Sequence, residues 1–120
     1  MARILAVDDS PSMRQMVWFA LQRGGHEVFQ AEDGVAALGL ARQQPVDLVL
    51  SDVHMPRMDG IALVEALRRL PELRYVPMLM LTTESSAEAK QRAKAAGATG
   101  WIVKPFDPER LLTTISQVLG

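Results

Sequence analysis

The chain alternates between short runs of apolar residues and longer segments in which apolar residues recur at every third or fourth position. The short runs are residues 4–7, 28–29, 48–50, 78–81 and 101–103. Four of them are apolar throughout, which is typical of strands buried on both faces of a parallel sheet. The run at 28–29 lies between Glu27 and Gln30, and this weaker pattern predicts a strand at an edge of the sheet.

The longer segments predict five helices. In the first, Ser10 and Pro11 provide the cap and a first-turn proline, and Gly24-Gly25 provides the stop. Its apolar stripe predicts a buried face made of Met13, Met16, Val17, Ala20 and Leu21.

The remaining helices have clear ends in the sequence. The second, residues 35–43, ends before Pro45, and the third starts at Asp59-Gly60 and ends before Pro71. The fifth opens at Asp107-Pro108. The fourth, residues 87–96, consists mostly of alanines among charged side chains, so we expect little large apolar surface to hold it. Gly97 should end it in a left-handed turn.

Strand and helix alternate five times, which predicts an α/β fold with a parallel sheet covered by helices on both faces. A chain of 120 residues fits one domain, so we expect residues 1–120 to form a single domain with no attached output module. Sheets of this kind bind ligands beyond the carboxyl ends of their strands. The residues that follow each apolar run are therefore the candidates for function.

The amino-acid composition argues against several classes of function. The 13 Lys and Arg nearly balance the 14 Asp and Glu, so we expect no nucleic-acid partner. The absence of cysteine excludes disulfides, thiolate catalysis and cysteine-bound zinc. The segment before the first apolar run is too short for a signal peptide or a membrane span, so we expect a cytoplasmic protein without membrane insertion.

Polar residues stand directly after the predicted strands. Asp8 and Asp9 follow the first strand, Asp52 the third, Thr82 the fourth and Lys104 the fifth. Each alone has an ordinary explanation, as a helix cap, a strand-end residue or a solvated lysine. Independent caps, however, have no reason to gather at the carboxyl edge of one sheet. The shared location predicts a functional site.

The three carboxylates of this site predict a bound cation, because like charges placed close together oppose one another's ionisation. Hard oxygen donors without cysteine favour Mg²⁺ over zinc or copper. Mg²⁺ and Lys104 together balance the formal charge of Asp8, Asp9 and Asp52. The site then has capacity for an added anion.

These residues belong to a series of motifs whose order and spacing are highly specific. The motifs are Val7-Asp8-Asp9-Ser10, Ser51-Asp52-Val53-His54-Met55-Pro56, Asp59-Gly60, Leu81-Thr82-Thr83-Glu84, Ala96-Gly97-Ala98 and Val103-Lys104-Pro105-Phe106. Over residues 3–119 the chain resembles the response regulator receiver domains of bacterial two-component systems, in their stand-alone, CheY-like chemotaxis form. The resemblance implies a doubly wound, five-stranded sheet with the flavodoxin-like order 2-1-3-4-5.

The resemblance also implies a role for each site residue. Asp52 would be the phosphoacceptor of a phosphorelay, taking a phosphoryl group from a chemotaxis-type histidine kinase to form an aspartyl phosphate. Asp9, Asp52 and the main-chain carbonyl of His54 would hold Mg²⁺ directly, and Asp8 would act through a water. Lys104 would neutralise phosphoryl oxygens.

A conformational switch is implied as well. The Thr82 hydroxyl would reach the new phosphoryl group, and Trp101, on the fifth strand, would move into the space that Thr82 vacates. The surface of the fourth helix, fifth strand and fifth helix would then bind a target, such as a flagellar motor switch component. Pro105 would follow a cis peptide bond. We expect a monomer that is not an enzyme, since it promotes only its own phosphorylation and dephosphorylation.

Three residues beside the site would tune dephosphorylation by resemblance: His54, Thr83 and Glu84. The imidazole of His54 would either screen the aspartyl phosphate from water or act as a base on that water. Because a base needs an orienting partner and the sequence shows none for His54, we expect screening.

Other functional classes fit the sequence less well. A haloacid-dehalogenase-like Mg²⁺-dependent phosphatase needs a second acid two residues after its nucleophile, where this chain has His54. A flavodoxin-type carrier would have its phosphate repelled by Asp8 and Asp9. A receiver that only binds partners would not need the intact set of acids, Thr82 and Lys104. A receiver domain cut from a longer regulator stays an open alternative.

Overall fold

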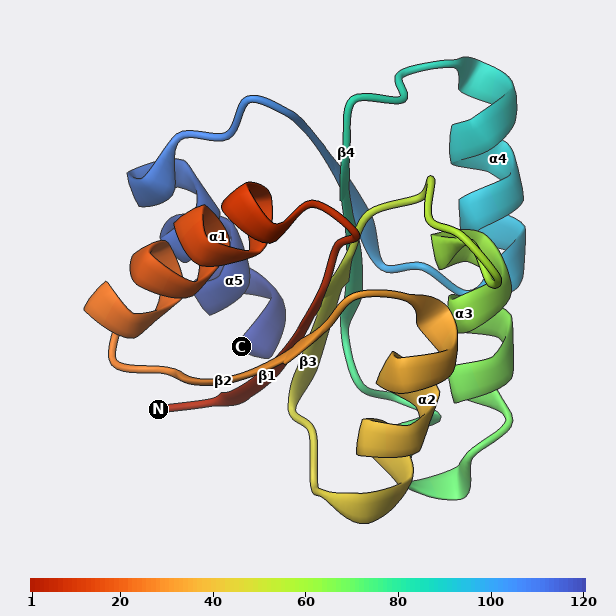
Figure 1. The fold of residues 1–120 in the computed structure, drawn as a ribbon, viewed down its shortest axis with the longest axis horizontal. Helices are drawn as coiled ribbons and strands as arrows, with labels where there is room; N and C mark the ends of the chain where they lie inside the picture. Colours follow the sequence, from red (N-terminus) through yellow and green to blue (C-terminus); the bar gives the residue numbers. More distant parts are fainter.

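Five parallel strands form the centre of the protein. In the computed structural model, which describes residues 1–120, they are β1 (Arg3–Val7), β2 (Glu27–Ala31), β3 (Leu48–Ser51), β4 (Met78–Thr82) and β5 (Gly100–Val103). The strand order is β2-β1-β3-β4-β5, and every neighbouring pair is parallel. The predicted fold class and strand order are therefore confirmed (Figure 1).

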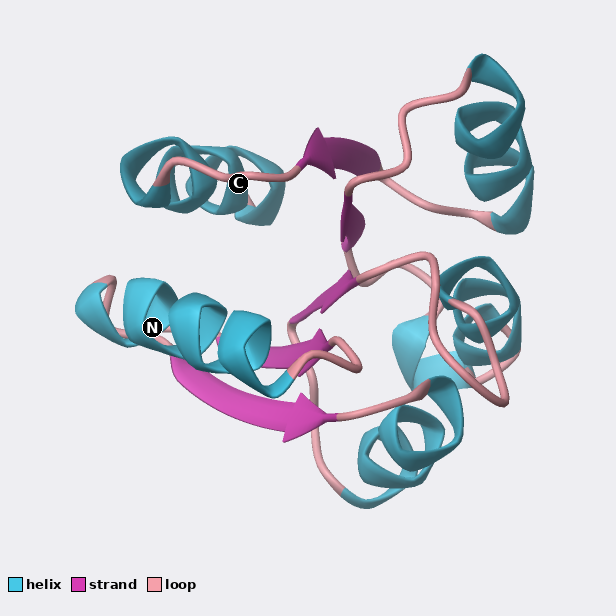
Figure 2. Ribbon diagram, turned by 45° about the horizontal axis from the view of Figure 1, so that its top comes forward, coloured by secondary structure: helices cyan, strands magenta, loops and turns pink.

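Helices cover both faces of this sheet. They are α1 (Pro11–Arg23), α2 (Gly34–Gln43), α3 (Gly60–Arg68), α4 (Ala87–Ala96) and α5 (Pro108–Leu119), with a short 3₁₀ helix at Pro71–Leu73. Helices α1 and α5 lie together on one face, and α2, α3 and α4 lie on the other (Figures 1 and 2). This arrangement makes three layers with a hydrophobic core on each side of the sheet.

The central strands hold the two cores together. All residues of β3 and β4 are buried, and their side chains alternate between the faces, with Val49 and Met78 on one side and Leu50 and Leu79 on the other. Burying one such side chain stabilises a fold by about 1.5–3 kcal/mol. The sheet centre is thus the rigid base on which the strand-end residues stand.

Helices α1, α3, α4 and α5 begin where the sequence predicts, and α2 begins one residue earlier, at Gly34. Ser10 Oγ accepts a hydrogen bond from the Met13 amide at 3.3 Å, and Asp59 Oδ1 accepts one from the Ala62 amide at 2.8 Å. Asp107 caps α5, and Gly97 ends α4 with a φ of 110°. Side-chain caps therefore fix where these helices start, and a left-handed glycine fixes where α4 stops.

Helix α4 is attached more weakly than its neighbours. Its only buried residues are Ala89, Ala93 and Ala96, as the sequence predicts. At its carboxyl end, however, the side chain of Arg68 donates two hydrogen bonds to the Gly97 carbonyl, at 3.0 and 2.8 Å. Burial lowers the pKa of Arg68. The end of α4 remote from the strand ends is therefore fastened by a half-buried guanidinium.

Two expectations about burial are wrong. Strand β5 is an edge strand, so its residues are half-buried and Val103 is 43 % exposed, although an entirely apolar run predicts burial on both faces. On α1, Met16 is 56 % exposed because it stands at the margin of the buried stripe, whereas Val17, Ala20 and Leu21 are buried. An apolar pattern does not distinguish an edge from a centre.

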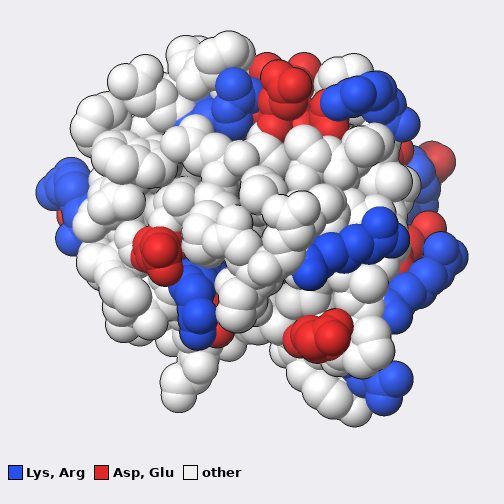
Figure 3. Space-filling view, turned by 60° about the horizontal axis from the view of Figure 1, so that its bottom comes forward, with Lys and Arg blue, Asp and Glu red and all other residues white.

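The surface carries both signs of charge. On the face shown in Figure 3, acidic and basic side chains are interspersed among wide uncharged areas. No helix combines the length and the apolar character needed to cross a lipid bilayer.

Candidate functional site

The three predicted acids meet at the carboxyl edge of the sheet. Strands β1 and β3 are neighbours, with Val7 opposite Ser51, so the residues that follow them emerge side by side. Carboxylate oxygens of Asp8, Asp9 and Asp52 lie within 4.8 Å of one another. Asp8 is buried, whereas Asp9 is exposed.

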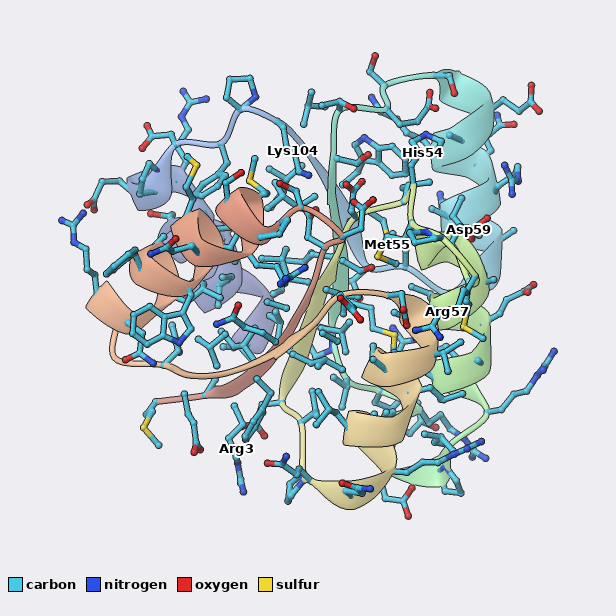
Figure 4. The ribbon with its side chains drawn as sticks, viewed as in Figure 1. Arg3, His54, Met55, Arg57, Asp59 and Lys104 are labelled. Atoms are coloured by element: carbon cyan, nitrogen blue, oxygen red, sulfur yellow. The ribbon has the colours of Figure 1, made fainter.

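Lys104 reaches the same point from the end of β5. Its Nζ lies 2.6 Å from Asp8 Oδ2 and 3.0 Å from Asp52 Oδ2. Figure 4 labels Lys104 near the strand ends. Burial acts to lower the pKa of Lys104, but hydrogen bonds to Asp8 and Asp52 and their negative charges outweigh it, so the pKa is raised. The ammonium therefore stays charged. The Lys104–Pro105 peptide bond is cis, as the sequence resemblance predicts.

Main-chain groups fix the orientation of the acids. Asp52 Oδ1 accepts hydrogen bonds from the amides of Val53, at 2.7 Å, and His54, at 3.4 Å, which leaves Oδ2 to Lys104. Asp8 Oδ1 accepts one from the Ser10 amide at 3.0 Å. The two carboxylates thus present one oxygen each to Lys104 and to any cation between them.

Arg14 supports Asp8 from α1 and was not predicted as a site residue. Its Nη1 donates to the main-chain carbonyl of Asp8 at 2.6 Å. Arg14 follows Asp8 by six residues and lies in the first turn of α1. The sequence gives no sign that its side chain points back toward the end of β1.

The donor set fits Mg²⁺. It consists of carboxylate oxygens without sulfur, which are the ligands that this ion prefers. The three acids and Lys104 carry a formal charge of -2, since -3 and +1 combine, and a divalent cation would neutralise it. Asp9 makes no hydrogen bond or ion pair, so its carboxylate is available as a ligand.

The predicted switch residues meet at the main chain of Glu84. Thr82 is fully buried at the end of β4, and its Oγ1 accepts a hydrogen bond from the Glu84 amide at 3.2 Å. Trp101 is half-buried on β5, and its Nε1 donates to the Glu84 carbonyl at 3.0 Å. Thr82 and Trp101 are therefore linked through one residue. Thr83 is exposed and makes no side-chain hydrogen bond.

The expectation that His54 lacks an orienting partner is wrong. Its Nε2 lies 2.9 Å from Glu84 Oε1, across the gap between the loops that follow β3 and β4. Hydrogen bonds from His54 and then from Ser86 lower the pKa of Glu84 to about 2. Because a carboxylate only accepts, Nε2 carries the hydrogen, and Nδ1 is the acceptor of the neutral ring. The two residues are 30 positions apart, so local patterns gave no signal.

A further ion pair stands next to the site. Arg57, in the loop between β3 and α3, contacts the buried carboxylate of Asp33 at the start of α2. Neither residue was predicted to matter. The charge of Arg57 was visible in the sequence, but its partner depends on how two loops lie in space.

A doubly wound sheet with three acids and a lysine at its carboxyl edge defines the class of receiver domains. The family described as "Response regulator receiver domain" matches residues 4–116, and the chain belongs to this family. Receiver domains are regulatory modules of two-component signalling and not enzymes in the usual sense.

Its similarity to individual proteins extends over the whole chain. It is 40 % identical to Protein PilH of Pseudomonas aeruginosa, over 100 % of this chain and 99 % of that protein. It is 53 % identical to the structure of Vibrio cholerae chemotaxis protein CheY4, with a TM-score of 0.95 and 98 % of each chain covered. A second similar structure is the receiver domain of a Pseudomonas aeruginosa sensor histidine kinase, described with a magnesium ion coordinated in its active site cleft. It has 27 % identity and a TM-score of 0.92 over 99 % of this chain and 98 % of that one.

Proposed function

We propose that Asp52 accepts a phosphoryl group from a phosphohistidine of a histidine kinase. In this transfer a carboxylate oxygen of Asp52 forms the O–P bond while the N–P bond of the phosphohistidine breaks, and the electron pair of that bond stays on the imidazole nitrogen. The product is an aspartyl phosphate. The single observation that carries the proposal is the position of Asp52, whose Oδ2 is bonded to Lys104 beside two further acids.

The neighbouring residues support this chemistry by their charge. Lys104 already bonds to Asp52 Oδ2, so its ammonium stands where phosphoryl oxygens would arrive. The amides of Val53 and His54 hold the other oxygen of Asp52 and orient the carboxylate for in-line attack.

We propose that Mg²⁺ binds through Asp9, Asp52 and the main-chain carbonyl of His54, with Asp8 acting through a water. When bound, Mg²⁺ supplies positive charge that stabilises the transferring phosphoryl group. The hard oxygen donors and the magnesium site of the similar receiver domain support this assignment. If it is right, Asp9→Ala should weaken Mg²⁺ binding, measured by the fluorescence of Trp18 and Trp101, whereas Glu65→Ala, which removes an exposed acid on α3, should not.

The output surface is proposed to be formed by α4, β5 and α5. Thr82 and Trp101 share hydrogen bonds with Glu84, and Glu84 Oε2 also accepts from the amide of Ser86, the residue that caps α4. A change at Thr82 is thereby passed to the start of α4. Beside Trp101, a surface pocket of about 340 Å³ lies between α4 and β5.

The similarity to CheY4 and PilH supports a role in chemotaxis-type signalling. The partners would be a chemotaxis-type histidine kinase and a downstream protein such as a flagellar motor switch component. We further propose that residues 1–120 act as one receiver domain, as a monomer, and that its only chemistry is its own phosphorylation and dephosphorylation. A single sheet built from the whole chain supports this assignment.

Acetyl phosphate with Mg²⁺ tests the proposal without the kinase. We expect the mass of one phosphoryl group to be added at Asp52, and Asp52→Asn to abolish the addition. Full labelling of Asp52→Asn would refute the assignment. Sustained release of phosphate from many small phosphate esters, without accumulation of a labelled aspartate, would instead support the phosphatase alternative.

A further inference from the structure

An ion pair joins the loop after the phosphoacceptor to the start of α2, and the chemistry described so far does not use it. Arg57 Nε donates to Asp33 Oδ2 at 3.0 Å, and Arg57 Nη2 contacts the same oxygen. We propose that Arg57, held by Asp33, is a positioning residue that fixes the main-chain carbonyl of His54 for Mg²⁺. This inference rests on the proposed function, because it concerns a ligand of that site.

Asp33 is a firm anchor for Arg57. It is 3 % exposed, and its second oxygen, Oδ1, accepts a hydrogen bond from the Ala36 amide at 2.9 Å as the cap of α2. The Ala36 hydrogen bond and then the Arg57 hydrogen bond lower the pKa of Asp33. The carboxylate is therefore ionised and held by a helix that packs on the sheet.

The backbone of Arg57 has a conformation that is unusual for a residue with a side chain. Its φ is 68°, the only positive φ at a residue other than glycine in the protein. Glycine and asparagine adopt this left-handed conformation more easily than arginine does. At this position an arginine can contact Asp33, whereas a glycine cannot.

The loop between β3 and α3 is held by contacts at several points, and His54 lies between these points. Its ends are closed by a hydrogen bond from the Gly60 amide to the Val53 carbonyl at 2.8 Å. His54 is tied to Glu84 on the side of α4, whereas Arg57 is tied to Asp33 on the side of α2 (Figure 4). The carbonyl of His54 is thus placed by two side-chain anchors on opposite sides.

Supports behind a metal ligand typically change metal affinity by about 10-fold to 100-fold when removed. Arg57→Gly removes the ion pair and accepts the left-handed backbone without strain, so it isolates the contribution of the side chain. Arg57→Asn is a second variant that also tolerates this backbone. Asp33→Asn removes the charge of the partner and keeps a side chain that caps helices well.

Variants of the two partners, Arg57 and Asp33, distinguish a positioning role from a simple effect of charge on Mg²⁺ affinity. Removing the positive charge of Arg57 would by itself favour a nearby cation, whereas removing the negative charge of Asp33 would disfavour it. A long-range charge effect therefore predicts opposite changes in Mg²⁺ affinity. A positioning role predicts weaker binding in both variants.

The experiment is a Mg²⁺ titration of the parent and variants, followed by tryptophan fluorescence, with thermal unfolding to confirm folding. We expect affinity to fall about 10-fold in Arg57→Gly, Arg57→Asn and Asp33→Asn, and no further in the Arg57→Gly/Asp33→Asn double variant. The labelling rate by acetyl phosphate at saturating Mg²⁺ should stay close to that of the parent. Arg42→Gln, which removes an exposed charge at the far end of α2, is the control and should bind as the parent does.

A second readout needs no metal. Hydrogen exchange of the Met58 amide, which donates to the Pro56 carbonyl at 2.7 Å, should be faster in Arg57→Gly than in the parent. Mg²⁺ binding by Arg57→Gly that is as tight as in the parent, or tighter, overturns the positioning role. If the parent itself neither binds Mg²⁺ nor is labelled at Asp52, the proposed function fails instead, and the two failures are distinguishable.

Discussion

Nε2 of His54 and Oε1 of Glu84 lie 2.9 Å apart and connect the loop after β3 with the loop after β4. The His54 side chain is 65 % exposed, so the ring would be free to rotate without this bond. Glu84 holds the ring of His54 in the loop that follows Asp52. Both proposed roles of His54, as a screen and as a base, gain from an oriented ring.

A missing partner no longer favours screening, because Glu84 orients the ring. We still expect His54 to screen the aspartyl phosphate from water, because its imidazole ring is bulky. His54→Ala should then lose the phosphoryl group faster than the parent at every pH between about 6 and 8, the range in which imidazoles titrate. The measurement is autodephosphorylation at saturating Mg²⁺. Slower loss in His54→Ala, together with loss of the parent's pH dependence, would instead identify Nδ1 as a base.

Glu84 should make stability depend on pH in acid. Its pKa in the folded protein is about 2, below its ordinary value of 4.5, so the stabilising effect of its charge is complete above pH 4.5 and is lost as pH falls toward 2. Glu84→Gln should therefore lower the unfolding temperature at neutral pH, and the difference from the parent should shrink below pH 4.5. Thermal unfolding measured across this range checks it. A difference that grows on acidification would contradict it.

Lys104→Met should separate metal binding from phosphoryl transfer. Removing an oriented donor of this kind costs about 10²-fold to 10³-fold in rate, so labelling by acetyl phosphate should slow by about 100-fold. Mg²⁺ affinity should rise, because a positive charge beside Asp8 and Asp52 has gone. Rate and affinity falling together would indicate that the variant has lost the site's structure.

Trp101→Phe should loosen the start of α4 by removing the donor to the Glu84 carbonyl. A hydrogen bond contributes about 0.5–1.5 kcal/mol, which corresponds to an increase of up to about 10-fold in local opening. Hydrogen exchange at residues 86–90 measures it, with the strand β1 amides as internal control. Unchanged exchange there would mean that Trp101 does not hold α4.

Gly60→Ala should damage the fold at the site. A Cβ at Gly60 would lie 2.0 Å from the main-chain oxygen of Asp52, so that backbone has to move. We expect a loss of about 2 kcal/mol or more in the free energy of unfolding, measured with urea. Gly39→Ala is the matched control, because a Cβ there meets nothing within 4 Å and alanine favours the helix. Equal effects of the two substitutions would refute the explanation.

The parts of the fold that depend on local chemistry were predictable from the sequence. Ser10, Asp59 and Asp107 cap helices where expected, because a cap acts on amides two or three residues away. The acids at the strand ends were predictable as a group, because parallel strands bring their carboxyl ends to one edge.

Pairings between distant loops were not predictable in the same way. His54 and Glu84, like Arg57 and Asp33, come together only after two loops have taken their paths, and the positive φ of Arg57 leaves no mark on the sequence. The exposure of Val103 depends on the place of β5 in the strand order, which the apolar pattern of β5 does not contain.

The small buried side chains of α4 affect how fast this helix can respond to a signal. A helix that buries only Ala89, Ala93 and Ala96 opens no large void when it shifts, while Arg68 keeps its far end attached to the Gly97 carbonyl. A shift of α4 would then meet a low barrier, and rearrangements of this size take microseconds to milliseconds. Under the proposed function, the duration of the signal would be set by how long the phosphoryl group stays on Asp52, and α4 would follow that chemistry without delay.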